Sequence, residues 1–378
     1  MHWLVGILLF ALAGSSTEAP SLSDKPLWTA NLTEDFGFER FDREINKNWL
    51  PYQGVVFLSP ERIAVYQLNR RSERVKLSPR NESGGAGNFY LQIEILNVRD
   101  GHEVGRLELP SPGLFSGVMP SRNGKFIVRT GDMIRLYSAS LQQIASHHLL
   151  LQKGESQAWE VTVSDSGDTL VAVRRPMYAD PASGDKPSYV EVLDAGTLQL
   201  KNTFQARGPA GWLTTVGERR ILSLAPVHGW QWNIMDMEGH SDRFDPSLSP
   251  LTRFGYRRIG LLAHDYLAVY GDQQLVVMSS PTQAVLKLSE PRQFFQLLVH
   301  ANEFIAVEVL ERPPYYKNGM PLLPHFAQID AYDLNTQAKI HAIERPSRGL
   351  YFAISRHGDL GIIAENRLEV LRGAREPE

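Results

Sequence analysis

One short pattern returns along this chain of 378 residues and constrains its fold more than any other feature. It reads "VMPSRNGKFIVRTGDMIRLY" at 118–137, "VTVSDSGDTLVAVRR" at 161–175 and "FAISRHGDLGIIAENRLEVL" at 352–371. Each copy alternates apolar with polar residues on both sides of a turn that holds serine and glycine. Such alternation is typical of half-buried strands, and glycine suits a turn that needs a positive φ. The pattern therefore predicts pairs of antiparallel strands.

Seven such strand pairs can be followed along the sequence, and a second pair follows each of the first six. The first pairs are Gly54–Ser59 with Arg62–Leu68, Phe115–Met119 with Lys125–Arg129, Trp159–Val163 with Thr169–Val173, Gly211–Val216 with Arg220–Leu224, Arg258–Ala263 with Tyr266–Tyr270, Phe294–Val299 with Phe304–Leu310, and Gly349–Ser355 with Leu360–Ala364. Four strands in a unit of about fifty residues are typical of a β-propeller, in which every sheet packs against two neighbours. We expect an all-β, seven-bladed β-propeller as a single domain over residues 25–373, with a polar tail at 374–378.

The last of these units is incomplete, because the chain ends soon after Arg367–Leu371. A sheet edge left unpaired there would invite aggregation. The segment Leu27–Asp35 has the pattern of a strand and precedes the first unit without a partner of its own. We expect it to pair with Arg367–Leu371 as the outermost strand of the last blade and so to close the ring.

A family resemblance adds to this reading. The stretch "VTVSDSGDTLVAV" at 161–173, followed by "YVEVLDAGTLQLKNTF" at 189–204, resembles the YVTN/WD40-like propeller repeats of exported bacterial proteins. The chain lacks the Trp-Asp dipeptide of true WD40 repeats. The resemblance implies a seven-bladed ring and no particular activity, because propellers serve both as enzymes and as scaffolds.

Composition and the N-terminal segment indicate which chemistry and partners to exclude and in which compartment to expect the protein. The chain has no cysteine, which excludes disulfides, thiolate nucleophiles and cysteine-bound metals. Its formal net charge of −3 gives no reason to expect a nucleic-acid partner. The apolar run Trp3–Ala13 is too short to span a bilayer, but it has the length of a signal peptide. We expect residues 1–19 to be a signal peptide, the protein to be exported to the periplasm or outside the cell, and the mature chain to lack a transmembrane segment.

The sequence offers no recognisable catalytic motif. "GHSDR" at 239–243 lacks the second glycine of a nucleophile elbow, and "GGAGN" at 84–88 lacks the lysine of a phosphate-binding loop. "DSGD" at 165–168 lacks the later acidic ligands of a calcium loop and is expected to be a turn. We therefore predict no catalytic residue, no bound metal and no cofactor.

Six histidines are distributed over five units of the repeat and could meet near the ring axis: His147, His148, His228, His264, His300 and His357. Propeller enzymes that bind a metal gather their ligands in this way. His264, His300 and His357, however, lie at turns that follow innermost strands, on the side opposite to the connecting loops. We expect them to be solvated turn residues.

Three long insertions, Asn69–Asn88, Arg174–Ser188 and Glu311–Phe326, each separate the second strand of a unit from the third. Because strand connections alternate between the two faces of a propeller, these insertions should share one face. Their arginine, tyrosine and lysine side chains are of the kinds that anchor interfaces: Arg70, Arg71, Arg74, Arg174, Arg175, Tyr178, Tyr315, Tyr316 and Lys317. We expect a non-enzymatic propeller that binds a protein or peptide through this face. The alternative is a propeller enzyme of the lactonase or quinoprotein-like type, with a small-molecule or metal site at the channel mouth.

Overall fold

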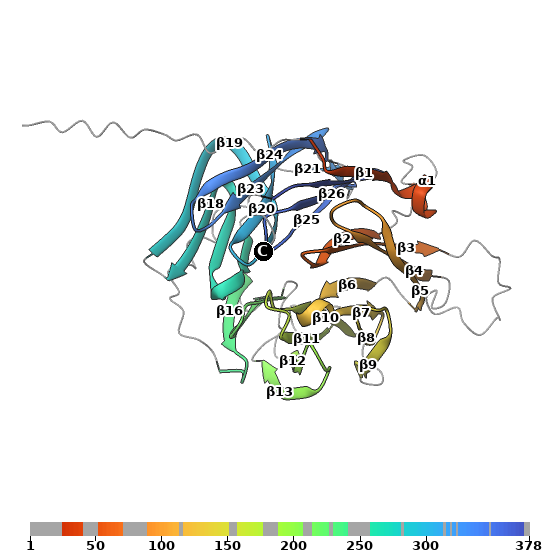
Figure 1. Cartoon of the computed structure of the whole chain (residues 1–378). Coiled ribbons are helices and arrows are strands. Elements are labelled where there is room, and N and C mark those ends of the chain that lie inside the picture. The colour runs from red at the N-terminus through yellow and green to blue at the C-terminus, as the bar shows by residue number, and fades with distance from the viewer. Residues whose placement is uncertain are drawn as a thin grey trace, which may run out of the picture.

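The strands of the molecule form sheets arranged around a central axis, which is the architecture of a β-propeller (Figure 1). The computed structural model describes residues 25–40, 52–70, 89–112, 116–150, 157–176, 188–206, 214–226, 230–240, 258–280, 283–312, 315–317, 320–322, 324–347 and 349–373. Within these ranges no helix has the length and apolar character that a membrane crossing requires. The proposed signal peptide at 1–19 and the tail at 374–378 lie outside the described residues.

The described chain is almost entirely β-structure. Its elements up to the third sheet are β1 (Trp28–Asn31), α1 (Leu32–Phe36), β2 (Tyr52–Ser59), β3 (Arg62–Arg70), β4 (Phe89–Asn97), β5 (Glu103–Ser111), β6 (Ser116–Pro120), β7 (Phe126–Thr130), β8 (Met133–Tyr137), β9 (Gln143–His148), β10 (Gln157–Val163), β11 (Thr169–Pro176), β12 (Ser188–Asp194) and β13 (Leu200–Ala206). The later strands are β14 (Thr214–Val216), β15 (Arg220–Pro226), β16 (Trp230–Asp236), β17 (Arg258–Leu261), β18 (Leu267–Ser280), β19 (Gln283–Ala301), β20 (Phe304–Leu310), β21 (Tyr315–Lys317), β22 (Met320–Leu322), β23 (Phe326–Asp333), β24 (Ala338–Pro346), β25 (Tyr351–Ile354), β26 (Leu360–Ala364) and β27 (Arg367–Leu371).

The expectation of seven separate blades is wrong. The described residues form five separate blades: the four-stranded sheets β2–β5, β6–β9, β10–β13 and β25–β27 with β1, and the three-stranded sheet β14–β16. The remaining large sheet is continuous and has six strands, in the order β17-β18-β19-β20-β23-β24. The strand pairs expected there do form, but the chain stays hydrogen-bonded where a break between blades was expected. Asp272 pairs with Phe294, and a register shift follows at Gln274, so β18 and β19 bulge without leaving the sheet.

The ring is closed by the N-terminal strand, as predicted. β1 pairs antiparallel with β27, with Trp28 opposite Val370 and Asn31 opposite Arg367. The predicted strand was too long, because residues 32–36 form the helix α1. The Asn31 side chain accepts hydrogen bonds from the backbone N–H groups of Thr33 and Glu34, and this N-cap ends the strand and starts the helix.

The segment that follows α1 is fastened to the first sheet by a buried glutamine. The backbone N–H of Glu39 donates to the Gln67 side-chain oxygen at 2.7 Å, and the Gln67 amide donates back to the Glu39 carbonyl at 2.9 Å. Gln67 is fully buried, so this pair satisfies both polar ends of a side chain that would otherwise be costly to bury. The closing segment is thus bound to the last sheet and to the first.

The apolar core lies between neighbouring sheets. One cluster joins Ile63 and Val65 of the first sheet to Ile363 and Leu368 of the last, and all four are fully buried. Other clusters join the second sheet to the third and the third to the fourth in the same way. Because each sheet has two faces to cover, this packing explains why the strand pattern must repeat.

The repeated Ser-x-x-Gly turns join the first two strands of their sheets. Gly124, Gly167 and Gly358 have φ values of +68°, +75° and +84°, which a residue with a Cβ adopts only with strain. Ser164 Oγ accepts from the backbone N–H of Thr169 at 3.0 Å. Ser355 Oγ accepts from the N–H of Asp359 at 2.9 Å. The recurrence seen in the sequence is therefore one turn used in three sheets.

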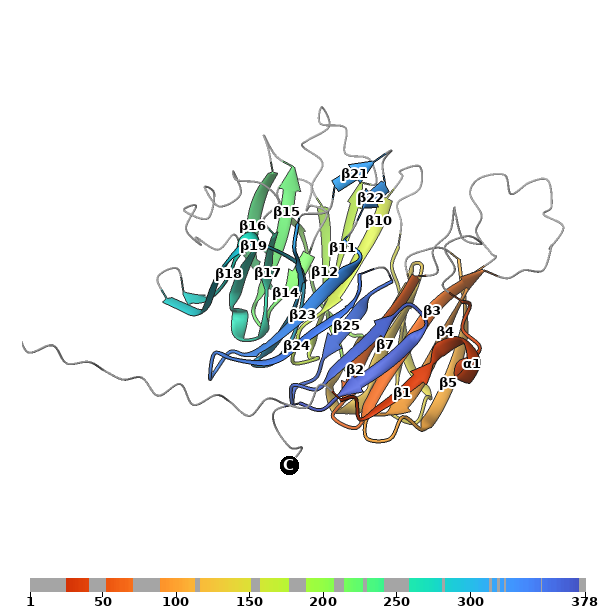
Figure 2. The same ribbon diagram turned by 90° about the horizontal axis from the view of Figure 1, so that it is seen from above.

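These turns define two faces of the ring. We call the face with the turns between the first and second strands of each sheet the turn face. Because neighbouring strands are antiparallel, β3, β11 and β20 run away from it and end on the opposite side, which we call the long-connection face. The hairpin of β21 and β22 follows β20 and lies at the upper edge of the ring in Figure 2.

Candidate binding site at the channel mouth

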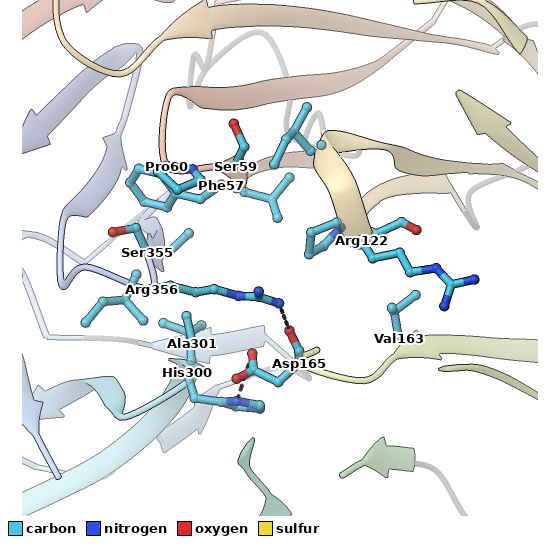
Figure 3. A pocket seen from close by; sticks show the side chains of 18 of the residues that line it. Phe57, Ser59, Pro60, Arg122, Val163, Asp165, His300, Ala301, Ser355 and Arg356 are labelled. Carbon is cyan, nitrogen blue, oxygen red and sulfur yellow. Dashed lines mark hydrogen bonds and ion pairs between the residues drawn. The ribbon is translucent and has the colours of Figure 1, made fainter. Parts of the chain in front are cut away.

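A cavity of about 450 Å³ opens at the centre of the turn face. Its walls come from the turns after β2, β6, β10, β19 and β25, so residues far apart in sequence meet there. Phe57 and Pro60 form part of an apolar wall, and Asp165, His300 and Arg356 lie together on another side (Figure 3). The size, and the combination of apolar walls with few polar groups, are typical of small-ligand sites.

Asp165 is the residue through which three sheets meet at this cavity. Its carboxylate accepts a hydrogen bond from the backbone N–H of Asn302 and lies 3.6 Å from His300 Nδ1, which is an ionic contact longer than a hydrogen bond. The Arg356 guanidinium donates to the Asp165 carbonyl oxygen. The turn after β10 is therefore tied directly to the turns after β19 and β25 across the channel mouth (Figure 3).

The surroundings of Asp165 keep its carboxylate ionised. Burial is the largest influence on its pKa and would raise it, since the side chain is only 13% exposed. His300, the Asn302 N–H and the charge of Arg356 together outweigh burial and hold the pKa of Asp165 below its ordinary value. A fixed negative charge therefore lies beside the polar end of the cavity.

Arg122 also lines the cavity, but its guanidinium binds carboxylates of the neighbouring sheet and does not face the cavity. It forms ion pairs with Asp168 and Asp194 of the third sheet, each at 3.1 Å. Nearby, Ser121 Oγ donates to the carbonyl of Ala195 at 2.9 Å, and Lys125 Nζ donates to that of Gly196 at 3.0 Å. These bonds join the second sheet to the third. Figure 3 shows the Arg122 side chain directed away from Arg356 and Asp165.

The sequence analysis gave a channel-mouth site only as an alternative and did not identify its residues, and its expectation for His300 is wrong. His300 is not a solvated turn residue: its side chain is 22% exposed, and its Nδ1 is buried beside Asp165. The turn "DSGD" at 165–168 is confirmed as a turn. Its role as a contact across the channel could not be read from local sequence, since Asp165 and Asn302 are 137 residues apart.

Among the binding residues predicted from the sequence, Arg174 is the one whose side-chain contacts the structure describes. It lies on β11 near the long-connection face, paired with Trp159 on one side and Tyr189 on the other. Its guanidinium carbon is 5.8 Å from the Trp159 ring centroid and 4.8 Å from that of Tyr189, within the range of cation–π contacts. Arg174 therefore forms a row with the buried Trp159 and the half-buried Tyr189 at this end of the third sheet.

The other predicted binding residues are either placed on strands by their backbone alone or lie outside the described residues. Arg70 ends β3, Arg175 belongs to β11, and Tyr315, Tyr316 and Lys317 form β21, which pairs with β22. Arg71, Arg74 and Tyr178 lie outside the described residues.

One group in the described part of the chain has donor types suitable for a metal ion. Asp236, Glu238 and His240 place one ligand atom each within 4.8 Å of one another. The group belongs to the turn after β16, where Asp236 already accepts from the backbone N–H groups of Glu238 and His240 at 2.9 Å. His240 Nδ1 lies 3.0 Å from Asp236 Oδ2. These bonds account for the arrangement as a stable turn.

Comparison with known proteins agrees with the fold. No family model matches the sequence, and no curated protein matches it. Among solved structures, the chain is similar to the β-propeller domain of the trilobed protease from Pyrococcus furiosus, with a TM-score of 0.52, 10% identity, and coverage of 86% of this chain and 97% of that one. It is also similar to the acylaminoacyl peptidase of Pyrococcus horikoshii, with a TM-score of 0.53, 12% identity, and coverage of 85% of this chain and 52% of that one.

These likenesses define the chain as a β-propeller and go no further. At such identities they support the fold alone, since one fold hosts many activities. The chain spans about half the length of the peptidase from Pyrococcus horikoshii, at 52%. The activity of that protein therefore belongs to a larger molecule.

Proposed function

We propose that this protein is a non-enzymatic binding propeller that engages a protein or peptide through its long-connection face. The observation that carries the proposal is the contact of the Arg174 guanidinium with the rings of both Trp159 and Tyr189. An arginine held against aromatic rings is ordered before a partner arrives, so less side-chain entropy is lost on binding. Arginine and the large aromatic residues are also those that dominate interface energies.

The remaining residues of the proposed surface lie at or after the ends of strands that run away from the turn face. Tyr315, Tyr316 and Lys317 lie on β21, which follows β20 on the same face. Arg70 and Arg175 are at the ends of β3 and β11, and Arg71, Arg74 and Tyr178 follow them in the chain. We propose that these residues surround the Arg174 row and enlarge the contact area.

A second candidate function is enzymatic, and one observation favours it. The cavity on the turn face brings an ionised aspartate, a histidine and an arginine together against apolar walls. A propeller enzyme of the lactonase or quinoprotein-like type would use such a channel mouth for a small substrate. Turnover of a small ester or lactone, abolished by Asp165→Asn, would favour this candidate over the binding propeller.

We further propose that the chain is an exported member of the YVTN/WD40-like repeat proteins. Support comes from the apolar run Trp3–Ala13 and from the repeat at 161–173 with its continuation at 189–204. N-terminal sequencing of the protein recovered from its native source tests export. A start after residue 13 supports it, and an intact Met1 contradicts it.

The binding proposal is tested by capture with matched variants of the full chain. The purified protein, Arg174→Ala, the double variant Tyr315→Ala with Tyr316→Ala, and the control Lys287→Ala are each immobilised and exposed to the native exported fraction. Lys287 is an exposed residue of β19 that is not among the proposed contact residues. We expect the control to retain a partner that both test variants lose by about 10-fold, while all melt at similar temperatures. Equal capture by all four proteins contradicts the proposal.

A further inference from the structure

Three charged side chains line the cavity on the turn face. They are Arg122, Arg356 and the ionised Asp165, whose carboxylate accepts from the Asn302 N–H and lies 3.6 Å from His300 Nδ1. Arg122 is paired outside the cavity with Asp168 and Asp194. The cation left to meet a ligand is therefore Arg356.

Arg356 is exposed and its guanidinium is held in place by a single hydrogen bond. One of its N–H groups donates to the Asp165 carbonyl, and its side chain makes no other hydrogen bond with the described residues. A guanidinium has five N–H donors in a planar fork that fits a carboxylate with two parallel bonds. Since the bond to Asp165 orients the group at the cavity (Figure 3), the remaining donors are available to an anion there.

The other side of the cavity is apolar. Pro60 is exposed at the rim, and Phe57 lies beside it in the wall (Figure 3). Two of the serine hydroxyls in the lining donate to protein groups: Ser121 Oγ to the Ala195 carbonyl, and Ser355 Oγ to the Asp359 carboxylate. The cavity thus offers one cationic group to an anion, an apolar wall, and a volume of about 450 Å³ that accommodates an aromatic ring with a short chain.

We propose that this cavity binds a small organic carboxylate with an apolar body about the size of an aromatic ring. The carboxylate is held by Arg356, and the apolar body lies against Phe57 and Pro60. Two sources offer this chemistry: the C-terminal residue of a peptide, and a free organic acid. This site is separate from the proposed partner surface, because it lies on the opposite face, so either proposal can fail without the other.

The test is calorimetric titration of the full chain with three probes. N-acetyl-L-phenylalanine represents a peptide C-terminus, 3-phenylpropionate represents a free acid, and N-acetyl-L-phenylalaninamide is the matched neutral control. The variants are Arg356→Gln, Arg356→Lys and Arg99→Gln. Arg99 is an exposed arginine of the β4–β5 turn that lies outside the cavity lining, so its replacement controls for a general loss of positive charge.

We expect both carboxylates to bind with Kd values of roughly millimolar or below, as ligands of this size can reach. The neutral amide should bind the wild-type chain at least about 10-fold more weakly than the acids do. The acids should bind Arg356→Gln at least about 10-fold more weakly than they bind the wild type, since a paired charge is lost in each case. Their affinity for Arg356→Lys should lie between those for the wild type and for Arg356→Gln, and their affinity for Arg99→Gln should equal that for the wild type. Tighter binding of N-acetyl-L-phenylalanine identifies the peptide source, and tighter or equal binding of 3-phenylpropionate identifies the free acid. No binding of either acid, equal binding of the amide, or equal effects of Arg356→Gln and Arg99→Gln overturns the proposal.

Discussion

The two faces of this propeller are built from the same strands in opposite ways. On the turn face, short turns with internal hydrogen bonds contact one another across sheets, as Asp165 does with Asn302 and Arg356. On the long-connection face, β3, β11 and β20 lead into the three insertions of the chain. The difference teaches that a ring of sheets can form a defined cavity from short turns on one face while the other face carries its longest connections.

Two buried carboxyl groups differ in the direction of their pKa shifts, depending on whether they lie at the turn face or within a strand. Asp165, on the turn face, has a lowered pKa because His300, the Asn302 N–H and Arg356 outweigh its burial. Glu308 lies four residues along β20 from the turn face, and burial raises its pKa to about 7 although the charge of Arg258 opposes the rise. One end of the structure therefore stabilises a buried negative charge, and the middle of a strand does not.

The largest expected effect concerns the packing of the turn face. A Cβ at Gly167 would lie 2.7 Å from the backbone nitrogen of Arg122 and 2.8 Å from the carbonyl carbon of Ser121. Gly167→Ala should therefore cost about 3 kcal/mol or more, or prevent folding, because strain from the positive φ adds to a clash with backbone. The measurement is urea denaturation followed by circular dichroism.

The matched control is Gly37→Ala, at the end of α1. Gly37 has a similar φ of +71°, but a Cβ there meets no atom within 4 Å. This variant should cost about 1–2 kcal/mol, the strain alone. Equal losses in the two variants would mean that the turns of the second and third sheets are not closely interlocked.

The next effect concerns Glu308 and depends on pH. Between about pH 4.5 and 7 the folded state keeps a proton that the unfolded state has lost, so wild-type stability falls as pH rises through this window. Glu308→Gln removes this dependence, and relative to wild type it should gain up to about 3 kcal/mol between pH 4 and pH 8. Urea denaturation at both pH values measures the gain. The exposed Glu344→Gln should show little change, and a similar gain there would refute burial as the cause.

The smallest effect, with the opposite pH dependence, belongs to Asp165. Its lowered pKa means that the carboxylate contributes stability at neutral pH and loses that contribution as pH falls through its folded-state pKa. Asp165→Asn should cost about 1–2 kcal/mol at neutral pH, and the cost should shrink on acidification toward about pH 3. Thermal melts across this range follow it. A cost that stays constant with pH would show that side-chain shape, not charge, makes the contact.

Features encoded by neighbouring residues were predictable. The two-residue period and the Ser-x-x-Gly turns predicted the strand pairs, and the unpaired Arg367–Leu371 edge predicted closure by the N-terminal strand. The prediction of seven separate blades was wrong, because β18 continues through the register shift between Asp272 and Gln274 and stays in the sheet despite a glycine and polar residues there. The length of β1 was overestimated because the capping role of Asn31 was overlooked.

The channel-mouth site was harder to predict than the fold. Asp165, His300 and Arg356 come from three turns, and nothing in the local sequence indicates that these turns meet. The excess of arginine and tyrosine on the insertions did direct attention to Arg174, whose neighbours Trp159 and Tyr189 are set by strand pairing. Strand register can be inferred from a hairpin, whereas contacts across a ring require the closed ring itself.

The most direct test of the contrast between the faces is a crystal structure of the full chain grown with N-acetyl-4-bromo-L-phenylalanine, using the anomalous signal of bromine. Our account predicts a bromine peak beside Phe57 and Pro60, with the carboxylate on Arg356 and no peak near Arg174. A bromine peak on the long-connection face, with the turn-face cavity free of ligand, would contradict it.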